Sequence, residues 1–195
     1  MGEAGEYDQA ISSILDLWGG QISYGGTTFF ETYRPQWNDV IGTNAPVPNN
    51  QAGYTSLAHP WSAGVLPWMS EQILGIHATT PGFETFAVLP HLGRQLTRVS
   101  GSTLTPYGTI EASFNTSTGE CSVTVPEGTT ADVGIPKVEK KITGVWVNGR
   151  MQEISSEDEE FVLLKALPAG SYDIQVTYEG ETPAFEAVSY THLWQ

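Results

Sequence analysis

The chain has 195 residues, of which 39% are hydrophobic and 11% aromatic, so a packed core is expected and the disordered class is excluded. Its 22 acidic and 8 basic residues give a net charge of −14, a field that repels nucleic acid. The single cysteine, Cys121, excludes an intramolecular disulfide and a cysteine-based metal site. No apolar run reaches the length of a membrane span and no signal peptide is visible, so we expect no membrane contact and assign no cellular location.

A helix is predicted over residues 7–18. Its apolar residues recur at i, i+4, i+7, i+8 and i+11 and so share one face: Tyr7, Ile11, Ile14, Leu15 and Trp18. Gly19 and Gly20 are expected to end this helix. Residues 24–56 are rich in Gly, Pro and Asn and predict a long loop, which in a compact domain is usually functional or disordered. The aromatic residues clustered within it favour a functional loop.

A second helix is predicted over residues 62–74, with Ser62 at its N-cap and Gly75 at its C-terminal end. Leu66, Met69 and Ile73 fall on one face of it. Two helices and a loop hide too little surface to form a core by themselves. We therefore expect residues 1–79 to complete a larger helical domain whose earlier part is absent from this chain.

The pattern changes to short runs of period 2 after Pro81. These runs are bounded by Gly, Pro or Asn and predict strands: FETFAVL, GTIEASF, CSVTVP, GVWVNG, FVLLKAL and SYDIQVTYEG. Such strands, with an Asn-Gly hairpin turn at 148–149, predict an antiparallel β-sandwich over residues 80–180. Residues 181–195 continue no pattern and are expected to be a disordered or non-native tail.

Two motifs stand out in the N-terminal part. The first is a helix ending in Trp18 followed by GGTTFFE at 25–31, and the second is SLAHPWSAG at 56–64. LPWMSEQILGI with TPGFETFAVLPHLG, and LTPYGTIEASF with VTVPEGTTADVGIP, follow in order. Together these segments resemble the C-terminal part of the family-78 α-L-rhamnosidases, and the resemblance extends over roughly residues 4–136.

The resemblance implies an α + β fragment: the last helices of an (α/α)6 barrel, a six-hairpin glycosidase, followed by the β-sandwich. It also implies an inverting glycoside hydrolase that removes terminal α-L-rhamnose from glycans or glycosides. Inversion needs two carboxyl groups about 6.5–9.5 Å apart, which leaves room for a water molecule. The general acid of the family lies upstream, so this chain is expected to carry the general base alone and to be inactive by itself. No cofactor is implied.

By the same resemblance Glu31 is the general base. A carboxylate held among aromatic rings is desolvated and so becomes a better base, which suits that role. His59 is the residue expected to hydrogen-bond a rhamnose hydroxyl. Trp18, Trp37 and Trp61 are expected to line the sugar site, because an indole packs well on the apolar face and methyl group of rhamnose. No histidine or carboxylate spacing predicts a metal site.

Two other readings stay open. The β-sandwich could be a non-catalytic carbohydrate-binding or structural module, since sandwiches often serve as accessory domains. Alternatively, the chain could belong to a six-hairpin glycosidase for another sugar, with Glu31 in the same role. Upstream sequence, or substrate panels on the longer protein, would discriminate between these possibilities.

Overall fold

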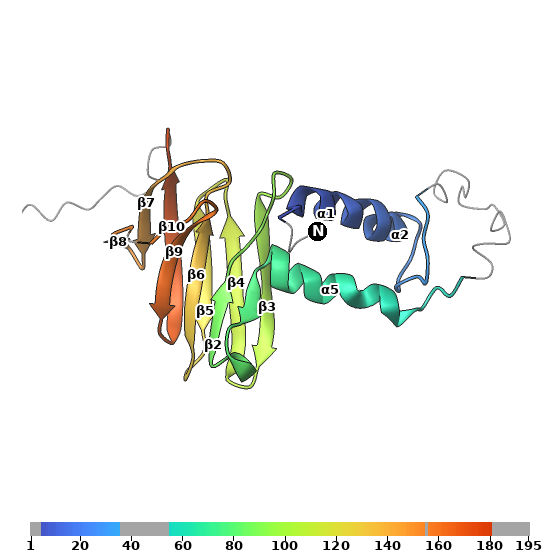
Figure 1. Ribbon diagram of the computed structural model, residues 1–195, viewed down its shortest axis with the longest axis horizontal. Helices are drawn as coiled ribbons and strands as arrows, with labels where there is room; N and C mark the ends of the chain where they lie inside the picture. The colour runs from blue at the N-terminus through green and yellow to red at the C-terminus, as the bar shows by residue number, and fades with distance from the viewer. Residues whose placement is uncertain (1–4, 36–54, 155, 181–195) are drawn as a thin grey trace, which may run out of the picture.

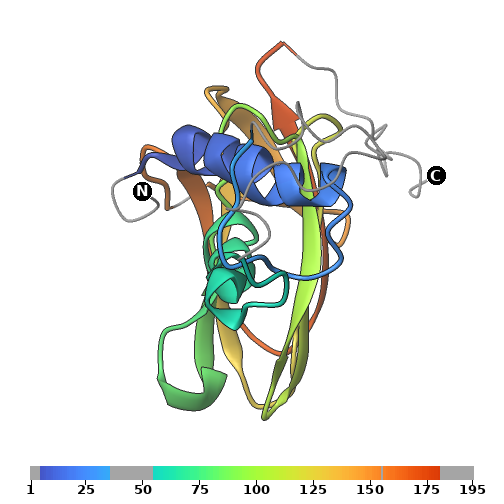
Figure 2. The ribbon, with the colours of Figure 1, turned by 90° about the vertical axis from the view of Figure 1, so that its right-hand side faces the viewer.

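The computed structural model describes residues 5–35, 55–154 and 156–180. A β-sandwich forms the body, and two helical segments lie side by side and extend from one end of it as an arm (Figures 1 and 2). The first segment joins α1 (Tyr7–Ile14), a π-helical turn (Leu15–Gly19) and α2 (Gly20–Ser23). The second joins a 3-10 turn (Pro60–Gly64), α5 (Val65–Trp68) and a π-helical turn (Met69–Ile73).

Gly19 and Gly20 do not end the first helix, so that prediction was wrong. Both residues keep right-handed helical backbone angles, and the helix runs on to Ser23. The Tyr33 ring packs so closely on Gly20 that a Cβ there would lie 2.6 Å from ring atoms. Glycine leaves room for the Tyr33 side chain at this point, and this packing outweighs the low helix propensity of glycine.

The second helix begins at Pro60 rather than at the predicted Ser62. Proline suits the first helical position because its φ is already helical and its missing N–H would have no partner there. The Ser62 hydroxyl does not cap the helix but donates to the Phe30 carbonyl at 2.6 Å. Gly75 ends this segment with φ +81°, which confirms the predicted stop.

The sandwich consists of two sheets. The first has the order β1-β2-β6-β9 and comprises Ile76–Ala78, Thr85–Val88, Thr130–Pro136 and Phe161–Leu167. The second has the order β3-β4-β5-β10-β7-β8 and comprises Arg98–Thr105, Gly108–Asn115, Glu120–Val125, Gly170–Tyr178, Ile142–Val147 and Arg150–Gln152. β1 already pairs with β2, so the sandwich starts ahead of the expected boundary at residue 80.

The expectation of a wholly antiparallel sandwich was wrong for one pair of strands. β2 and β6 run parallel, with Thr85 opposite Thr130 and Val88 opposite Val133. Between them the chain passes through β3, β4 and β5 of the other sheet and returns in the same direction, as a parallel pair requires. The predicted tail, 181–195, lies outside the described residues.

Alternating side chains of both sheets fill the core of the sandwich. On β4, Ile110, Ala112 and Phe114 are buried while Glu111 is exposed. They face residues of the first sheet such as Val88 and Val133, which are fully buried. Each large apolar side chain of this kind contributes roughly 1.5–3 kcal/mol when it leaves water, so the sandwich is the stable part of the chain.

The arm is tied to the sandwich at both of its helices. Leu74, at the end of the second helix, belongs to the core cluster of the sandwich. Asp8, in the first turn of α1, accepts hydrogen bonds from the backbone N–H and Nε of Arg94 at 2.7 and 2.6 Å. Gln95 Nε2 donates to the Asp8 carbonyl and to Ser12. These contacts fix the direction in which the arm leaves the body.

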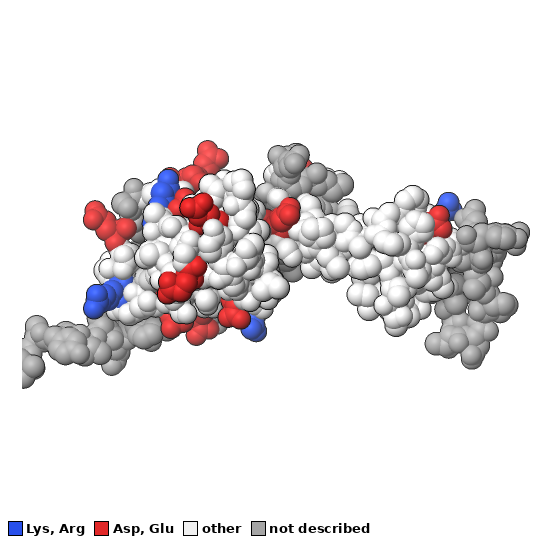
Figure 3. Space-filling model, turned by 90° about the horizontal axis from the view of Figure 1, so that it is seen from below, with Lys and Arg blue, Asp and Glu red and all other residues white. Residues whose placement is uncertain are grey.

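Several predicted face residues of the arm are exposed rather than packed. Leu15 and Leu66 are more than half exposed, and Met69 is 42% exposed. Charged residues gather on the sandwich, whereas the visible face of the arm carries few of them (Figure 3). The arm thus presents an apolar surface that the described part of the chain does not cover. No helix among the described residues is both long and apolar enough to span a membrane.

Candidate active site

Two stretches far apart in sequence meet at the outer end of the arm. The Glu31 N–H donates to the Ser56 carbonyl at 2.8 Å, and the His59 N–H donates to the Phe29 carbonyl at 2.7 Å. The Thr28 hydroxyl also donates to the Leu57 carbonyl. These bonds hold the two stretches side by side in antiparallel directions, so the motif containing Glu31 and the motif containing His59 form one structure.

The Glu31 carboxylate lies at the centre of this structure. Its Oε2 accepts the Ser56 N–H at 3.0 Å and lies 4.0 Å from His59 Nδ1. The Glu31 carbonyl accepts the indole N–H of Trp61 at 2.8 Å. About one third of the Glu31 side chain is exposed, so its second oxygen can reach a water molecule.

His59 owes its position to the proline that follows it. A residue before proline is restricted to extended backbone, and His59 adopts φ −122° and ψ 109°. Its ring lies 4.4 Å from the Trp61 ring, tilted by 47°. Trp61 is 67% exposed and provides a large apolar face beside the histidine and the carboxylate.

The other two predicted tryptophans do not join this group in the same way. The indole N–H of Trp18 donates to the Ser62 carbonyl at 3.0 Å, so it connects the first helix to the turn that holds Trp61. Trp18 is half-buried between the two halves of the arm. Trp37 lies outside the described residues. The structure thus brings together Glu31, His59 and Trp61.

A support that the sequence did not reveal lies behind Glu31. Gln21 is buried, and its Oε1 accepts the Phe30 N–H at 3.0 Å. Phe30 is 3% exposed and its ring packs against Tyr24 and Tyr33. Gln21 falls three residues after Trp18, on the same face of the helix, and that spacing is the one sequence signal that could have indicated it.

The expected enclosure of Glu31 by aromatic rings is not present. Neighbouring residues of an extended stretch point to opposite sides, so the ring of Phe30 enters the arm while Glu31 stays at the surface. A carboxylate, an imidazole and an indole face remain, and they can accept a proton, form a hydrogen bond to a hydroxyl and support an apolar ligand surface. Among the described residues no group of three His, Cys, Asp or Glu side chains is placed to hold a metal ion.

Sequence comparison places the chain among known proteins. Residues 75–148 match the family model of the bacterial alpha-L-rhamnosidase C-terminal domain. An alpha-L-rhamnosidase of Formosa agariphila is 27% identical over 186 residues, which cover 90% of this chain and 19% of that protein. An alpha-L-rhamnosidase of Alteromonas sp. (strain LOR) is 28% identical over 172 residues, or 87% of this chain and 17% of that protein.

The chain is similar to the C-terminal portion of known α-L-rhamnosidases. This confirms the resemblance seen in its motifs, and the chain spans less than a fifth of the length of these two relatives. The structures of the α-L-rhamnosidases from Dictyoglumus thermophilum and Streptomyces avermitilis share the fold, with TM-scores of 0.63 and 0.60 at 20% and 21% identity. They match 81% and 82% of this chain, which covers 17% and 15% of theirs.

The α-L-rhamnosidase from Aspergillus terreus matches 61% of this chain, which covers 13% of that structure. Its TM-score is 0.50 and its sequence identity 28%. The described portion of the present chain is mostly β-sheet, with the two short helical segments of the arm.

Proposed function

We propose that this chain supplies the general base of an inverting enzyme that hydrolyses terminal α-L-rhamnose from glycans or glycosides. Glu31 takes a proton from the attacking water, and His59 hydrogen-bonds a sugar hydroxyl. One observation carries the proposal: Glu31 and His59 come from separate motifs, yet their side chains approach to 4.0 Å beside the exposed ring of Trp61.

The chemistry of each group supports its role. The Ser56 N–H donates to Oε2 of Glu31, which fixes the carboxylate and leaves its other oxygen for water. The Trp61 face provides a surface for the apolar side and methyl group of rhamnose. Trp18 holds the turn that carries Trp61, and Trp37 completes our proposed lining of the site.

The second carboxyl group and most of the pocket walls come from a part of the enzyme upstream of this chain. The exposed apolar residues on the arm support this, since Leu15, Ile22 and Leu66 are each more than half exposed. We propose that further helices of an (α/α)6 barrel cover them, with residues 1–79 as its last helices. Burial of such side chains contributes roughly 1.5–3 kcal/mol each, which is enough to fasten the two parts together.

The test compares Glu31→Gln with Glu71→Gln in this chain joined to its upstream part. Glu71 is an exposed carboxylate on the second helix of the same arm and is a matched control. Loss of a general base lowers kcat by about 10²–10⁴-fold, whereas the control keeps its activity. NMR of the first-released sugar should show the inverted β-anomer.

Three results would contradict the proposal. They are full activity of the Glu31→Gln enzyme, first release of the α-anomer, and release of p-nitrophenol from p-nitrophenyl α-L-rhamnoside by the 195-residue chain alone. The last result would mean that the chain contains its own general acid.

A further inference from the structure

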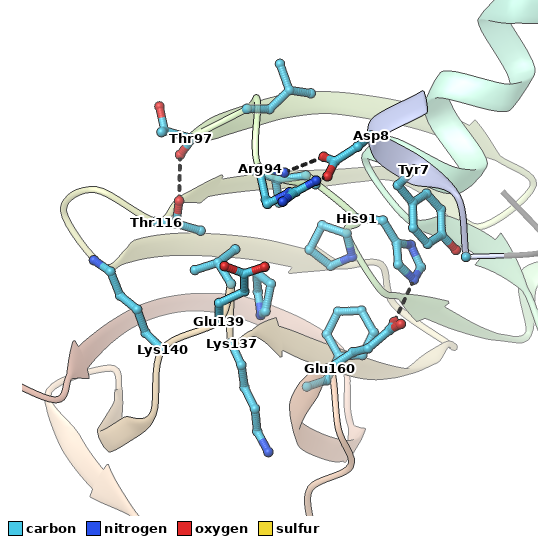
Figure 4. Close-up of a pocket in the computed structure, with 18 of the residues that line it drawn as sticks. Tyr7, Asp8, His91, Arg94, Thr97, Thr116, Lys137, Glu139, Lys140 and Glu160 are labelled. Carbon is cyan, nitrogen blue, oxygen red and sulfur yellow. Dashed lines mark hydrogen bonds and ion pairs between the residues drawn. The ribbon is translucent and has the colours of Figure 1, made fainter. Parts of the chain in front are cut away.

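A second hollow lies at the other end of the arm from Glu31. It is a groove of about 670 Å³ between the start of α1 and the sandwich. Figure 4 shows its residues coming from α1, from the stretch around His91 and Arg94, and from the stretch around Lys137 to Lys140. The helix between the two sites covers residues 7–23, so about 25 Å separates them and neither is a subsite of the other.

The wall and floor of this groove are apolar and well packed. Tyr7 stacks on His91 with ring centroids 4.1 Å apart and planes at 13°. His91 is held in turn by Glu160, at 3.3 Å from its Nε2, and by the edge of Phe161. Partial burial, and secondly the charge of Glu160, raise the pKa of Tyr7, as expected for a half-buried phenol near a carboxylate. Leu92 and Pro136 complete a buried floor.

Two groups of opposite charge stand over that floor. Arg94 uses its backbone N–H and Nε to bind Asp8, while 74% of its side chain stays exposed. The pKa of Arg94 is raised chiefly by Asp8 and to a smaller extent by the negative charge of Glu139, so the Glu139 carboxylate lies near the guanidinium. Figure 4 places the Glu139 carboxylate over the groove and turned toward Arg94. No hydrogen bond or ion pair within the described ranges uses the Glu139 carboxylate.

The backbone that presents Glu139 is strained. Val138 and Glu139 both have left-handed φ angles, 42° and 61°, which L-residues other than Asn and Asp rarely adopt. The strain is held by the Lys140 N–H to Lys137 carbonyl bond at 2.8 Å and by the Lys137 ion pair with Glu157. Strained residues persist where surrounding structure fixes them, and they concentrate at ligand clamps.

We propose that this groove binds a neutral saccharide unit, with Arg94 and Glu139 holding neighbouring hydroxyls. The terminal nitrogens of Arg94 donate and the Glu139 carboxylate accepts, so together they match a pair of vicinal hydroxyls. The floor packs against the C–H face of the sugar ring. Three cationic and four acidic side chains line the groove, a near balance that attracts neither a polyanion nor a polycation: Arg94, Lys137, Lys140, Asp8, Glu139, Glu159 and Glu160.

The inference goes beyond the proposed function, because it assigns a binding site with no role in bond cleavage. If the groove binds one sugar unit, the chain holds a glycan on the sandwich while another sugar unit of the same glycan occupies the catalytic site. A sugar in the groove contacts few groups, so a dissociation constant on the order of 1 mM is expected.

The test is a titration of the isotope-labelled 195-residue chain with methyl α-L-rhamnoside, and separately with methyl β-D-glucoside, followed by amide NMR shifts. The expected result is a saturable shift of the Gly93, Arg94 and Glu139 amides with at least one of the two neutral probes. Glu139→Ala should weaken this binding roughly tenfold, because a hydrogen bond to a charged group is lost. Glu127→Ala removes an exposed carboxylate from a turn outside the groove and should leave it unchanged.

Each outcome decides the question. The absence of saturable shifts at the groove with both sugars at about 100-fold excess over the expected constant overturns the proposal and leaves the groove to a polypeptide segment. Equal binding by Glu139→Ala and wild type also overturns it. Shifts confined to Glu31 and His59 would support the catalytic assignment and refute the groove, so the two proposals fail separately.

Discussion

Replacement of Gly75 by alanine tests how the arm is joined to the sandwich. Gly75 ends the second helix with φ +81° and lies between Leu74 and Ile76, both of which belong to the core cluster. A Cβ at this position would lie 2.1 Å from both the carbonyl carbon and the carbonyl oxygen of Leu89. These atoms are backbone, so the clash cannot be relieved by a change of rotamer.

The expected cost has two parts. A left-handed backbone costs an alanine about 1–2 kcal/mol relative to glycine. Moving the Leu89 backbone away also stretches the hydrogen bond from the Leu89 N–H to the Gly75 carbonyl, now 2.9 Å long and worth about 1 kcal/mol. The free energy of unfolding of the Gly75→Ala chain should therefore be about 2–3 kcal/mol lower than that of the wild type.

Urea unfolding followed by far-UV circular dichroism measures this difference. With a slope of about 2 kcal/mol per molar urea, the midpoint should fall by about 1–1.5 M. Gly64→Ala is the matched control: Gly64 has φ −56°, and a Cβ there meets no heavy atom within 4 Å. That change should stabilise the chain by about 0.4–1 kcal/mol, because alanine loses less backbone freedom on folding.

Two results would refute this reasoning. If Gly75→Ala unfolds within about 0.5 kcal/mol of wild type, the close approach of Gly75 to Leu89 does not restrict the junction. If Gly64→Ala is destabilised as much as Gly75→Ala, the cost comes from loss of glycine in general rather than from the clash and the left-handed backbone.

Two further predictions concern ionisable groups. Burial raises the pKa of the Cys121 thiol to about 12, so at about pH 8 only about one thiol in 10⁴ is ionised. Iodoacetamide should therefore react with Cys121 only in denaturant. Rapid labelling of Cys121 in the folded chain would contradict its burial. The backbone and side-chain hydrogen bonds from Arg94 hold the pKa of Asp8 below its usual 3.8 in the folded chain. The stabilisation by Asp8 is therefore fully present above pH 3.8 and is lost as the pH falls through its folded-state pKa. The urea midpoints of wild type and Asp8→Asn should therefore converge as the pH falls through the folded-state pKa of Asp8. A constant difference between the two midpoints down to about pH 2 would disprove the link between Asp8 ionisation and stability.

Local patterns in the sequence determined much of the sandwich. β9, Phe161–Leu167, coincides with the predicted run FVLLKAL, and β4, β5, β7 and β10 overlap predicted runs. Alternation of apolar and polar residues suffices when one face of a strand is buried and the other is wet. β3 was missed because RVSGSTLT is largely exposed and carries little apolar alternation.

The helical arm shows how tertiary contacts override local preference. Gly19 and Gly20 indicate a helix end by themselves, yet Tyr33 packs on Gly20 and the helix continues. Gly75 behaved as its sequence position predicts, because its left-handed backbone is a local property that glycine alone adopts easily. The prediction at Gly20 failed because Tyr33, a residue outside the helix and distant in sequence, packs on it and so decides the conformation.

The two sites also differ in how far the sequence alone could indicate them. Motifs in the sequence singled out Glu31, His59 and Trp61, since the residue types and spacing are themselves the signal. The 4.0 Å approach of Glu31 to His59, the support from Gln21 and the open side of the carboxylate depend on packing between segments that local pattern does not encode. The groove of Arg94 and Glu139 exists only in the folded chain, because its walls are 45 positions apart (139 − 94) and meet where the arm joins the sandwich.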